Sequence, residues 1–211
     1  MPPRAKFSRE EIVEAALQLT REGGPGAVTA RDIAARLNVS TRPIFTYFKT
    51  MDELKGAARA AAESLYRERI ERGLRAKIPF LGVEMEYLRF ACDEPQLYRL
   101  LFLTRPEDGN AGAMAAMRRT QAQVCESLMK TYQIQAGEAD WYFRNMWLAA
   151  HSLATLAVTV GPVCDMDEMR TILTEFSLSL LKAIKTIPGI AAGDIDRKAA
   201  FEDILGAAEK G

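Results

Sequence analysis

Apolar side chains recur three and four residues apart along most of this 211-residue chain, whereas alternating runs of Val, Ile and Thr are almost absent. Spacings of three and four place side chains on one face of an α-helix, and alternation is typical of a half-buried strand. Apolar residues make up 48% of the chain, which is enough for a substantial core. The pattern therefore predicts an all-α protein without internal repeats.

Three short helices are predicted in the N-terminal quarter. Ser8 and Glu11 match a capping box, in which each side chain binds an amide of the first turn. A Gly-Gly-Pro-Gly run then stops this helix. Thr29 begins the second helix and Ser40 the third, and only a few residues around Asn38 join them. Two short helices with so short a connection are typical of a helix-turn-helix.

A long helix over residues 51–75 follows, because Thr50 and Glu53 form another capping box. It connects a helix-turn-helix domain at residues 1–54 to a larger helical domain at residues 76–211. In the larger domain the spacing of apolar residues predicts helices at 80–93, 95–104, 111–132, 138–160 and 166–186, and a last one from Asp194.

The start of the third helix carries the residues expected to read DNA. In a helix-turn-helix the second helix lies in the major groove, with its first residues over the base edges. Thr41 and Arg42 are the first exposed positions, and an arginine can donate two hydrogen bonds to guanine. Pro43 costs no hydrogen bond in a first turn. Ile44 and Phe48 lie four residues apart and are expected to face inward.

Net charge gives this interpretation only weak support. The chain has 28 basic and 28 acidic residues, and residues 1–55 hold nine basic and seven acidic ones. The excess there is +2, so the remainder carries −2. Double-stranded DNA is therefore expected to be recognised by the placement of a few cations rather than by a basic domain.

The stretch from Thr29 to Leu54 resembles the DNA-binding signature of the tetracycline-repressor (TetR) family. It reads T-x-x-D-I-A-x-x-L-x-V-S-x-x-x-I-F-x-Y-F-x-x-x-D-E-L. The resemblance implies three N-terminal helices, a connecting fourth, and a larger domain for ligand binding and dimerisation. The expected DNA-binding residues are Thr29, Arg31, Ser40, Thr41, Arg42, Pro43, Thr46, Tyr47 and Lys49, with Arg4 and Lys6 as an N-terminal arm.

Three positions depart from the family pattern. Asn38 stands where glycine is usual, and asparagine tolerates the same left-handed backbone conformation. Phe45 stands where tyrosine is usual, and Met51 where lysine is usual. Because both usual residues contact phosphate or hold the backbone, phosphate contacts are expected instead at Tyr47, Lys49, Thr29 and the first amides of the helix.

The C-terminal part resembles one TetR subgroup, which has a Trp-His-Gly-type domain. The resemblance lies in DEPQLYRLLF at residues 93–102 and WLAAHSLATL at residues 147–156, although Ser152 stands where that subgroup often has glycine.

An effector cavity is expected among the aromatic residues and methionines of this second part. His151 is the only histidine, and Trp147 lies four residues before it on the same helix face. The alternative for His151 is a packed core residue, and no second ligand at metal spacing accompanies it. The residues expected to line the cavity are Tyr98, Phe102, Met117, Trp147 and His151.

The helices at 138–160 and 166–186 are expected to pair with their copies in a homodimer, as TetR-like proteins do. The alternative is that both complete the core of one subunit. Residues 145–164 carry no charge over a length that could span a bilayer, but polar residues interrupt the stretch and a buried helix explains it better. No membrane partner is expected.

Catalysis finds no support, because Ser152 beside His151 is not a nucleophile–base pair and no phosphate loop is present. No metal or cofactor is expected. Three scattered cysteines and the absence of an apolar leader indicate a cytoplasmic protein with reduced thiols. The sequence thus predicts a ligand-responsive, DNA-binding regulator, most simply a homodimeric repressor. The alternatives are a helical ligand-binding protein that does not bind DNA and a thiol-based redox sensor.

Overall fold

The computed structural model describes residues 7–104, 112–161 and 164–208. The prediction of an all-α protein is confirmed, because these residues form ten α-helices and no strand. The helices are α1 (Arg9–Gly23), α2 (Ala30–Arg36), α3 (Arg42–Tyr47), α4 (Met51–Leu74), α5 (Pro79–Asp93), α6 (Pro95–Tyr98), α7 (Ala113–Tyr132), α8 (Ala136–Thr159), α9 (Met166–Thr186) and α10 (Arg197–Ala208). A 3₁₀ turn, η1 (Pro25–Ala27), follows α1, and a π-helical turn, η2 (Arg99–Leu103), extends α6.

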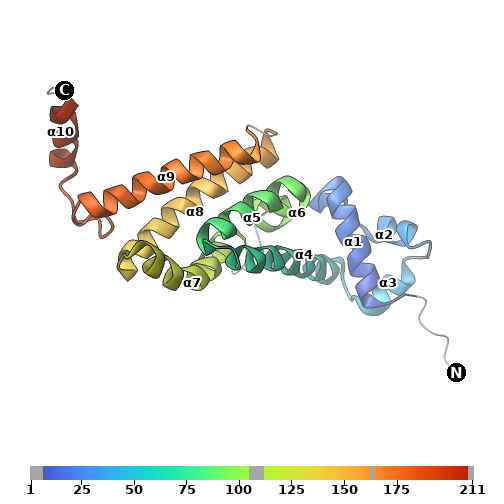
Figure 1. Ribbon diagram of the computed structural model, residues 1–211. Helices are drawn as coiled ribbons and strands as arrows, with labels where there is room; N and C mark the ends of the chain where they lie inside the picture. Colours follow the sequence, from blue (N-terminus) through green and yellow to red (C-terminus); the bar gives the residue numbers. More distant parts are fainter. Residues whose placement is uncertain (1–6, 105–111, 162–163, 209–211) are drawn as a thin grey trace.

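The molecule is elongated (Figure 1). Helices α1, α2 and α3 lie together at one end, and α4 runs from them beneath α5. Helices α8 and α9 lie side by side at the other end, and α10 projects beyond them. Among the described residues, no helix is both long enough and apolar enough to cross a membrane.

The structure confirms one of the two capping boxes predicted in the N-terminal part in full and the other in part. The Ser8 amide donates to the Glu11 carboxylate at 2.7 Å, and the Glu11 amide donates to the Ser8 hydroxyl at 3.1 Å. This reciprocal capping box satisfies two amides that a helix leaves without partners. At the other capping box the Thr50 hydroxyl accepts from the Glu53 amide, but the Glu53 carboxylate accepts from the Lys49 amide instead of that of Thr50.

The turn between α2 and α3 corrects one prediction. Asn38 has a φ of 53°, which is the expected left-handed conformation. However, α3 begins at Arg42, so Thr41 and not Ser40 is the residue before the helix, and the Thr41 side chain makes no capping bond. A capping side chain serves the second or third amide of a helix. Pro43 has no amide, and the Ile44 amide already donates to the Thr41 carbonyl, so neither of these two positions needs a side-chain cap.

Two clusters of buried side chains form the interior. The smaller one joins α1 to α3 and the start of α4, and it includes Ile12, Ile33, Ile44, Phe48 and Leu54, each no more than 1% exposed. The expected inward positions of Ile44 and Phe48 are therefore confirmed. Burying a side chain of this size contributes about 1.5–3 kcal/mol, so this cluster holds a six-residue helix in a fixed orientation.

The larger cluster is built around α4, α5, α7 and α8. Helices α4 and α5 cross closely because Gly73 and Gly82 lie at their contact. A Cβ atom on Gly73 would come within 2.7 Å of the Gly82 backbone. Of the helices predicted in this part, the one at 95–104 differs most, because it is a short α-helix that continues as the π-helical turn. The last helix begins at Arg197, after Asp196 caps the amide of Ala199.

Candidate DNA-binding surface and ligand cavity

The outward face of α3 carries four exposed side chains: Thr41, Arg42, Phe45 and Thr46. They occupy two successive pairs with a spacing of four, so they form one patch while Ile44 and Phe48 point into the core. Phe45 is 48% exposed and lies within this patch. Phe45 is not among the DNA contacts predicted from the sequence, although it lies four residues after Thr41 and therefore shares its face of the helix.

The basic side chains around α2 and α3 differ in whether they form ion pairs within the protein. The Arg36 guanidinium pairs with the Glu22 carboxylate. By contrast, Arg31, Arg42 and Lys49 are exposed, and none forms an ion pair with another described residue. Their charges are therefore available to a polyanion without breaking a contact within the protein.

The other expected DNA contacts have mixed surroundings. The Thr29 hydroxyl accepts from the Asp32 amide and donates to the Asp32 carboxylate, so it serves mainly to cap α2. Ser40 is exposed and Pro43 is half-buried. The Tyr47 hydroxyl donates to the Phe7 carbonyl at 2.8 Å, which ties α3 to the residue before α1. Arg4 and Lys6 lie outside the described residues.

Four of the five residues expected to bind an effector come together. The Trp147 and His151 rings stack with centroids 4.8 Å apart and planes 10° apart. The His151 Nδ1 atom lies 2.9 Å from the Tyr98 hydroxyl, and the Tyr98 ring lies 4.9 Å from that of Phe102. Met117 is also buried but lines a separate surface hollow beside Gln121 and Arg144.

Two residues that were not predicted from the sequence, Tyr87 and Thr155, complete this polar cluster. The Tyr87 hydroxyl lies 2.7 Å from His151 Nδ1, and the Thr155 hydroxyl lies 3.1 Å from that of Tyr98. Burial lowers the pKa of His151 below its usual value, which favours the neutral ring at pH 7. In a neutral ring one nitrogen accepts a hydrogen bond. His151 can therefore accept one tyrosine hydrogen at Nδ1, while the other tyrosine donates to a neighbouring hydroxyl.

A small cavity lies next to this cluster, between α4, α5, α7 and α8. Its volume is about 10 Å³, roughly room for one water molecule. Tyr66, Glu84, Thr120 and Trp147 are among the residues that line it. Of these, only Trp147 was predicted from the sequence. Glu84 is one of two acidic residues, with Glu86, that interrupt an apolar stretch of the sequence.

The cysteines do not have the surroundings of a thiol sensor. Burial and a hydrogen bond to Asp140 raise the pKa of Cys125 to about 11. Burial also raises the pKa values of Cys92 and Cys164, each of which has an acidic neighbour. Reactive cysteines instead have a lowered pKa, because the thiolate is the reacting form. These surroundings disfavour the redox-sensing alternative.

Two family models match this chain. The model of bacterial regulatory proteins of the tetR family matches residues 12–58, and a tetracyclin repressor-like C-terminal domain matches residues 81–176. Together they cover the helix-turn-helix and most of the aromatic cluster and cavity wall, but not Tyr66 and Phe80, which lie between the two matched ranges. The resemblance to the Trp-His-Gly subgroup stays a prediction.

Curated relatives and solved structures agree with these matches. An HTH-type transcriptional regulator of Mycobacterium tuberculosis is 24% identical over 166 residues, which cover 77% of this chain and 75% of the relative. An HTH-type transcriptional repressor of the same species is 42% identical over 57 residues, 27% of this chain and 30% of the relative.

Among solved structures, a tetR-family transcriptional regulator from Streptomyces coelicolor has a TM-score of 0.66 and 18% identity over 96% of this chain and 99% of its own. A TetR variant from Acinetobacter baumannii in complex with minocycline has a TM-score of 0.57 and 20% identity over 85% of this chain and 97% of its own. At such identities the structures show the same fold. With both family models matched over most of its length, the chain is a helix-turn-helix transcriptional regulator that belongs to the tetR family.

Proposed function

We propose that this regulator is a homodimeric repressor that binds a palindromic operator and is released from it by a small molecule. The observation that supports this most directly is the outward patch of α3, because its orientation is fixed by Ile44 and Phe48 in the core beneath. A helix held in this way can enter a major groove with its first residues over the bases.

Thr41 and Arg42 would contact the bases, with Thr46 and Phe45 beside them. The Thr46 hydroxyl donates to the Arg42 carbonyl at 3.2 Å, so its methyl group is the part left for a base. Arg31 and Lys49 would contact phosphates, since neither is paired with a described carboxylate. Arg4 and Lys6 would add a basic arm. Two copies of α3 on one face of the duplex require half-sites about 34–36 Å apart, or a small multiple of this.

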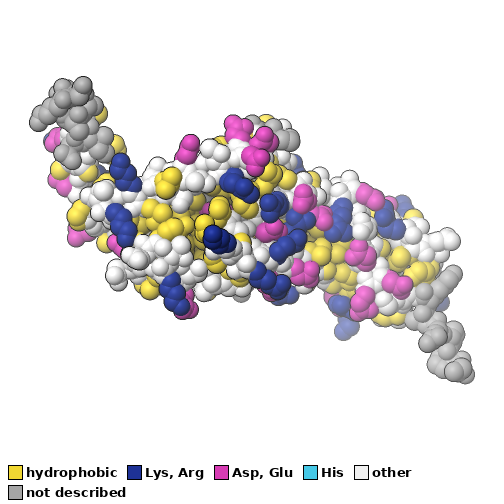
Figure 2. Space-filling view, in the orientation of Figure 1, with side chains coloured by type: hydrophobic (Ala, Val, Ile, Leu, Met, Phe, Trp, Pro, Cys, Tyr) yellow, Lys and Arg dark blue, Asp and Glu magenta, His cyan; other side chains and the backbone are white. Residues whose placement is uncertain are grey.

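The dimer would form through α8 and α9. These helices are held together by the hydroxyl groups of Tyr142 and Ser177, 2.6 Å apart. The sequence predicts that residues 145–164 are buried on most sides. In the structure one face of α8 is exposed, and Leu148, Ser152 and Leu156 lie along it. Figure 2 shows basic and acidic side chains interspersed over one face of the molecule, with hydrophobic ones gathered around α7 and α8. The large apolar side chains exposed on α8 and α9 are Leu148, Leu156, Ile172, Phe176 and Leu178.

Release by an effector needs a physical connection between the cavity and α3. Helix α4 provides it, because it begins at Met51, three residues after Phe48, and carries Tyr66 in the cavity wall. The Arg59 guanidinium on α4 also donates to the carbonyls of Leu100 and Leu101, at 2.6 and 2.9 Å. A ligand that moves these contacts would change the spacing of the two recognition helices. Such coupling is typically about 1–3 kcal/mol and acts equally in both directions.

The proposed division of the chain follows from the two buried clusters. Residues 1–54 would form the DNA-binding domain, α4 would connect, and residues 76–211 would bind the effector and form the dimer. A role on chromosomal DNA implies a cytoplasmic location. The relative with minocycline supports a ligand-binding role for the second domain, without indicating which ligand this chain binds.

The test is selection of bound sequences from random duplex DNA, followed by binding measurements over a range of salt concentrations. The expected result is a palindrome whose half-sites have the stated spacing, with affinity that falls steeply as salt releases counterions. Recovery of unenriched DNA, or binding that does not change with salt, would contradict the proposal.

A further inference from the structure

The small cavity contains two buried polar groups that lack a protein partner. The Oε1 atom of Glu84 and the Nε1 atom of Trp147 are both buried, and neither makes a hydrogen bond to another described residue. Both residues line the same cavity, and they are 5% and 6% exposed. Leaving a buried donor or acceptor without a partner costs about 1–3 kcal/mol. This cost favours any ligand that supplies the missing donor and acceptor.

Neither group can turn easily toward solvent. Trp147 is held by its stacking on His151, and its ring also lies 6.0 Å from that of Tyr87. Glu84 lies on α5, between Phe80 and Tyr87 in the wall of the cavity. Burial raises the pKa of Glu84 well above its ordinary value. A carboxyl group in such surroundings is stabilised in its charged form only by a nearby cation or by several hydrogen-bond donors.

The rest of the wall is aromatic. Tyr66, Phe80, Tyr87, Phe143 and Trp147 all contribute rings. Aromatic faces attract cations and pack well against flat apolar groups. A neutral ligand would gain from the rings and from a hydrogen bond to Glu84, whereas a cation would also gain from the charge of the Glu84 carboxylate, which forms when the carboxyl group releases its proton to solvent.

An opening to the surface lies next to the cavity. A hollow of about 110 Å³ between α4 and α7 shares Tyr66 and Thr120 with the cavity wall. The side chains of these two residues therefore separate the inner space from solvent. Since the inner space is too small for more than a water molecule, an organic ligand must displace this partition. Tyr66 lies on α4, the helix that leads to α3.

We propose that the cavity binds a small aromatic amine, with its protonated nitrogen on Glu84, its ring among the aromatic side chains, and an oxygen of the ligand accepting from Trp147 Nε1. This inference rests on the proposed function, since it names the chemical class of the effector that the second domain would bind. The amine enters through the hollow between α4 and α7 by displacing the side chains of Tyr66 and Thr120.

The experiment uses the full-length protein and probes of matched shape. They are 3-phenylpropylamine, the neutral 3-phenylpropan-1-ol and the anionic 3-phenylpropionate, with 2-phenoxyethylamine as an amine that adds an ether oxygen. Binding is measured by calorimetry and by the shift in melting temperature. Both amines should bind, the alcohol and the carboxylate should bind at least about tenfold more weakly, and the ether should bind more tightly than its CH₂ counterpart.

Two variants assign the effect to the two residues. Glu84→Gln should remove the preference for the amines over the alcohol, whereas Glu71→Gln, an exposed position on α4, should keep it. Trp147→Phe should remove only the advantage of the ether. Equal binding of amine and alcohol, a preference that survives Glu84→Gln, or no binding of either amine at millimolar concentration would overturn the proposal. A cavity that holds only a structural water would give the last result.

Operator binding separates this inference from the proposed function. If the amines bind through Glu84 but leave operator affinity unchanged, the ligand class stands and the release mechanism is wrong. If instead neutral compounds bind in the second domain and release the operator independently of Glu84, the proposed function as a ligand-released repressor is supported and the proposed ligand class is wrong.

Discussion

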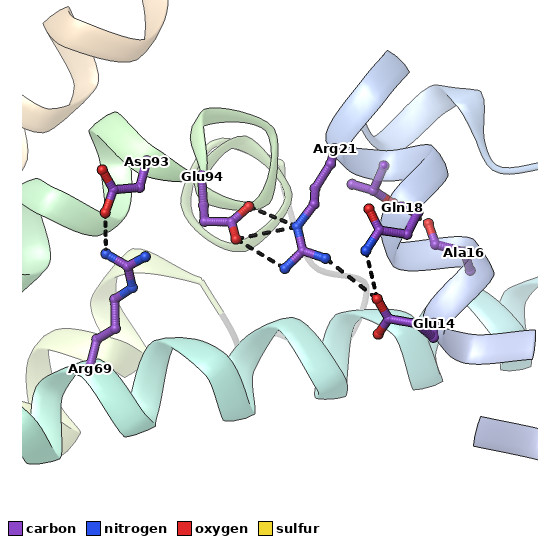
Figure 3. A network of polar contacts seen from close by, with 8 residues as sticks. Glu14, Ala16, Gln18, Arg21, Arg69, Asp93 and Glu94 are labelled. Carbon is purple, nitrogen blue, oxygen red and sulfur yellow. Dashed lines mark hydrogen bonds and ion pairs between the residues drawn. The ribbon is translucent and has the colours of Figure 1, made fainter. Parts of the chain in front are cut away.

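The Arg21 guanidinium and the Glu94 carboxylate form a forked ion pair between α1 and the start of α6 (Figure 3). The Arg21 Nε atom donates to both carboxylate oxygens at 2.9 and 3.2 Å, and a terminal nitrogen donates at 2.9 Å. Both side chains are about three-quarters buried. The hydrogen bonds to Glu94 raise the pKa of Arg21 above its usual value. This pair joins the DNA-binding end to the helix that carries Tyr98.

Glu94→Gln should lower the free energy of unfolding by about 1 kcal/mol, because it replaces a two-pronged charged contact with a weaker neutral one. It should also reduce the effect of a bound effector on operator affinity, since one connection between the two ends is weakened. Unfolding in urea and operator titrations with and without effector measure the two effects.

Asp93→Asn is the matched control, because it removes the adjacent 2.6 Å pair with Arg69, which joins α4 to α5 and does not contact α1. Equal loss of coupling in both variants would contradict this role.

Arg42→Ala should weaken operator binding by about 1–3 kcal/mol and relax the preference at one base pair in each half-site. Lys49→Ala should weaken all duplexes alike and reduce the salt dependence, because a phosphate contact carries no sequence information. Titration against single-base operator variants distinguishes the two. If the ranking of operator variants stays the same with Arg42→Ala, the residue does not read a base.

Local features of this fold were predictable from sequence, and contacts between distant segments were not. The caps at Ser8 and Thr29 and the left-handed Asn38 follow from residue types a few positions apart. Ser40 was placed wrongly because the missing amide of Pro43 also removes the need for a side-chain cap. The bond between Tyr87 and His151 joins residues 64 positions apart, and no sequence spacing indicates it. The sequence shows both Glu84 and Glu86 as acidic residues within an apolar stretch, but only packing shows that Glu84 lines a cavity.

Gly73→Ala should lower stability by about 1–3 kcal/mol, because a methyl group would meet the backbone of Gly82 and force α4 and α5 apart. Gly56→Ala on the same helix has nothing within 4 Å of the added atom. It should raise stability by about 0.5–1 kcal/mol through helix propensity alone. Thermal and urea unfolding measure both. A stabilising effect at position 73 would show that α4 and α5 have room for a methyl group at this contact.

Phe176→Glu should convert the dimer to a monomer, because it places a charge within the apolar side chains of α8 and α9 that are left exposed in a single chain. Operator affinity should then fall about 100-fold or more, since two linked heads bind much more tightly than one. Analytical ultracentrifugation and operator titration measure these effects. Met114→Glu, an equally apolar exposed position on α7, is the control and should remain dimeric. A dimeric Phe176→Glu would mean that the subunits meet elsewhere.

Glu84→Gln should raise stability at neutral pH, and the gain should depend on pH in a defined direction. Below about pH 4.3, the ordinary glutamate pKa, both the folded and the unfolded protein hold the Glu84 proton, so the variant and the wild type should differ little. Above that pH the unfolded chain releases the proton, whereas burial keeps it on the folded protein. The wild type then loses at most about 1.4 kcal/mol per pH unit, until the pH exceeds the raised pKa of the folded state. Glutamine has no such proton, so the stability of the variant relative to the wild type should rise through this window and then level off.

The other carboxyl groups titrate in both proteins, so the difference between the two unfolding curves isolates Glu84. Urea unfolding between about pH 4.5 and 8 measures it, and Glu71→Gln at an exposed position should show no such trend. A Glu84→Gln variant that is less stable than the wild type at pH 7 would mean that the folded protein holds Glu84 ionised. The carboxylate would then have a partner in the protein without ligand, and the cavity would not offer an amine a carboxyl group that lacks a partner.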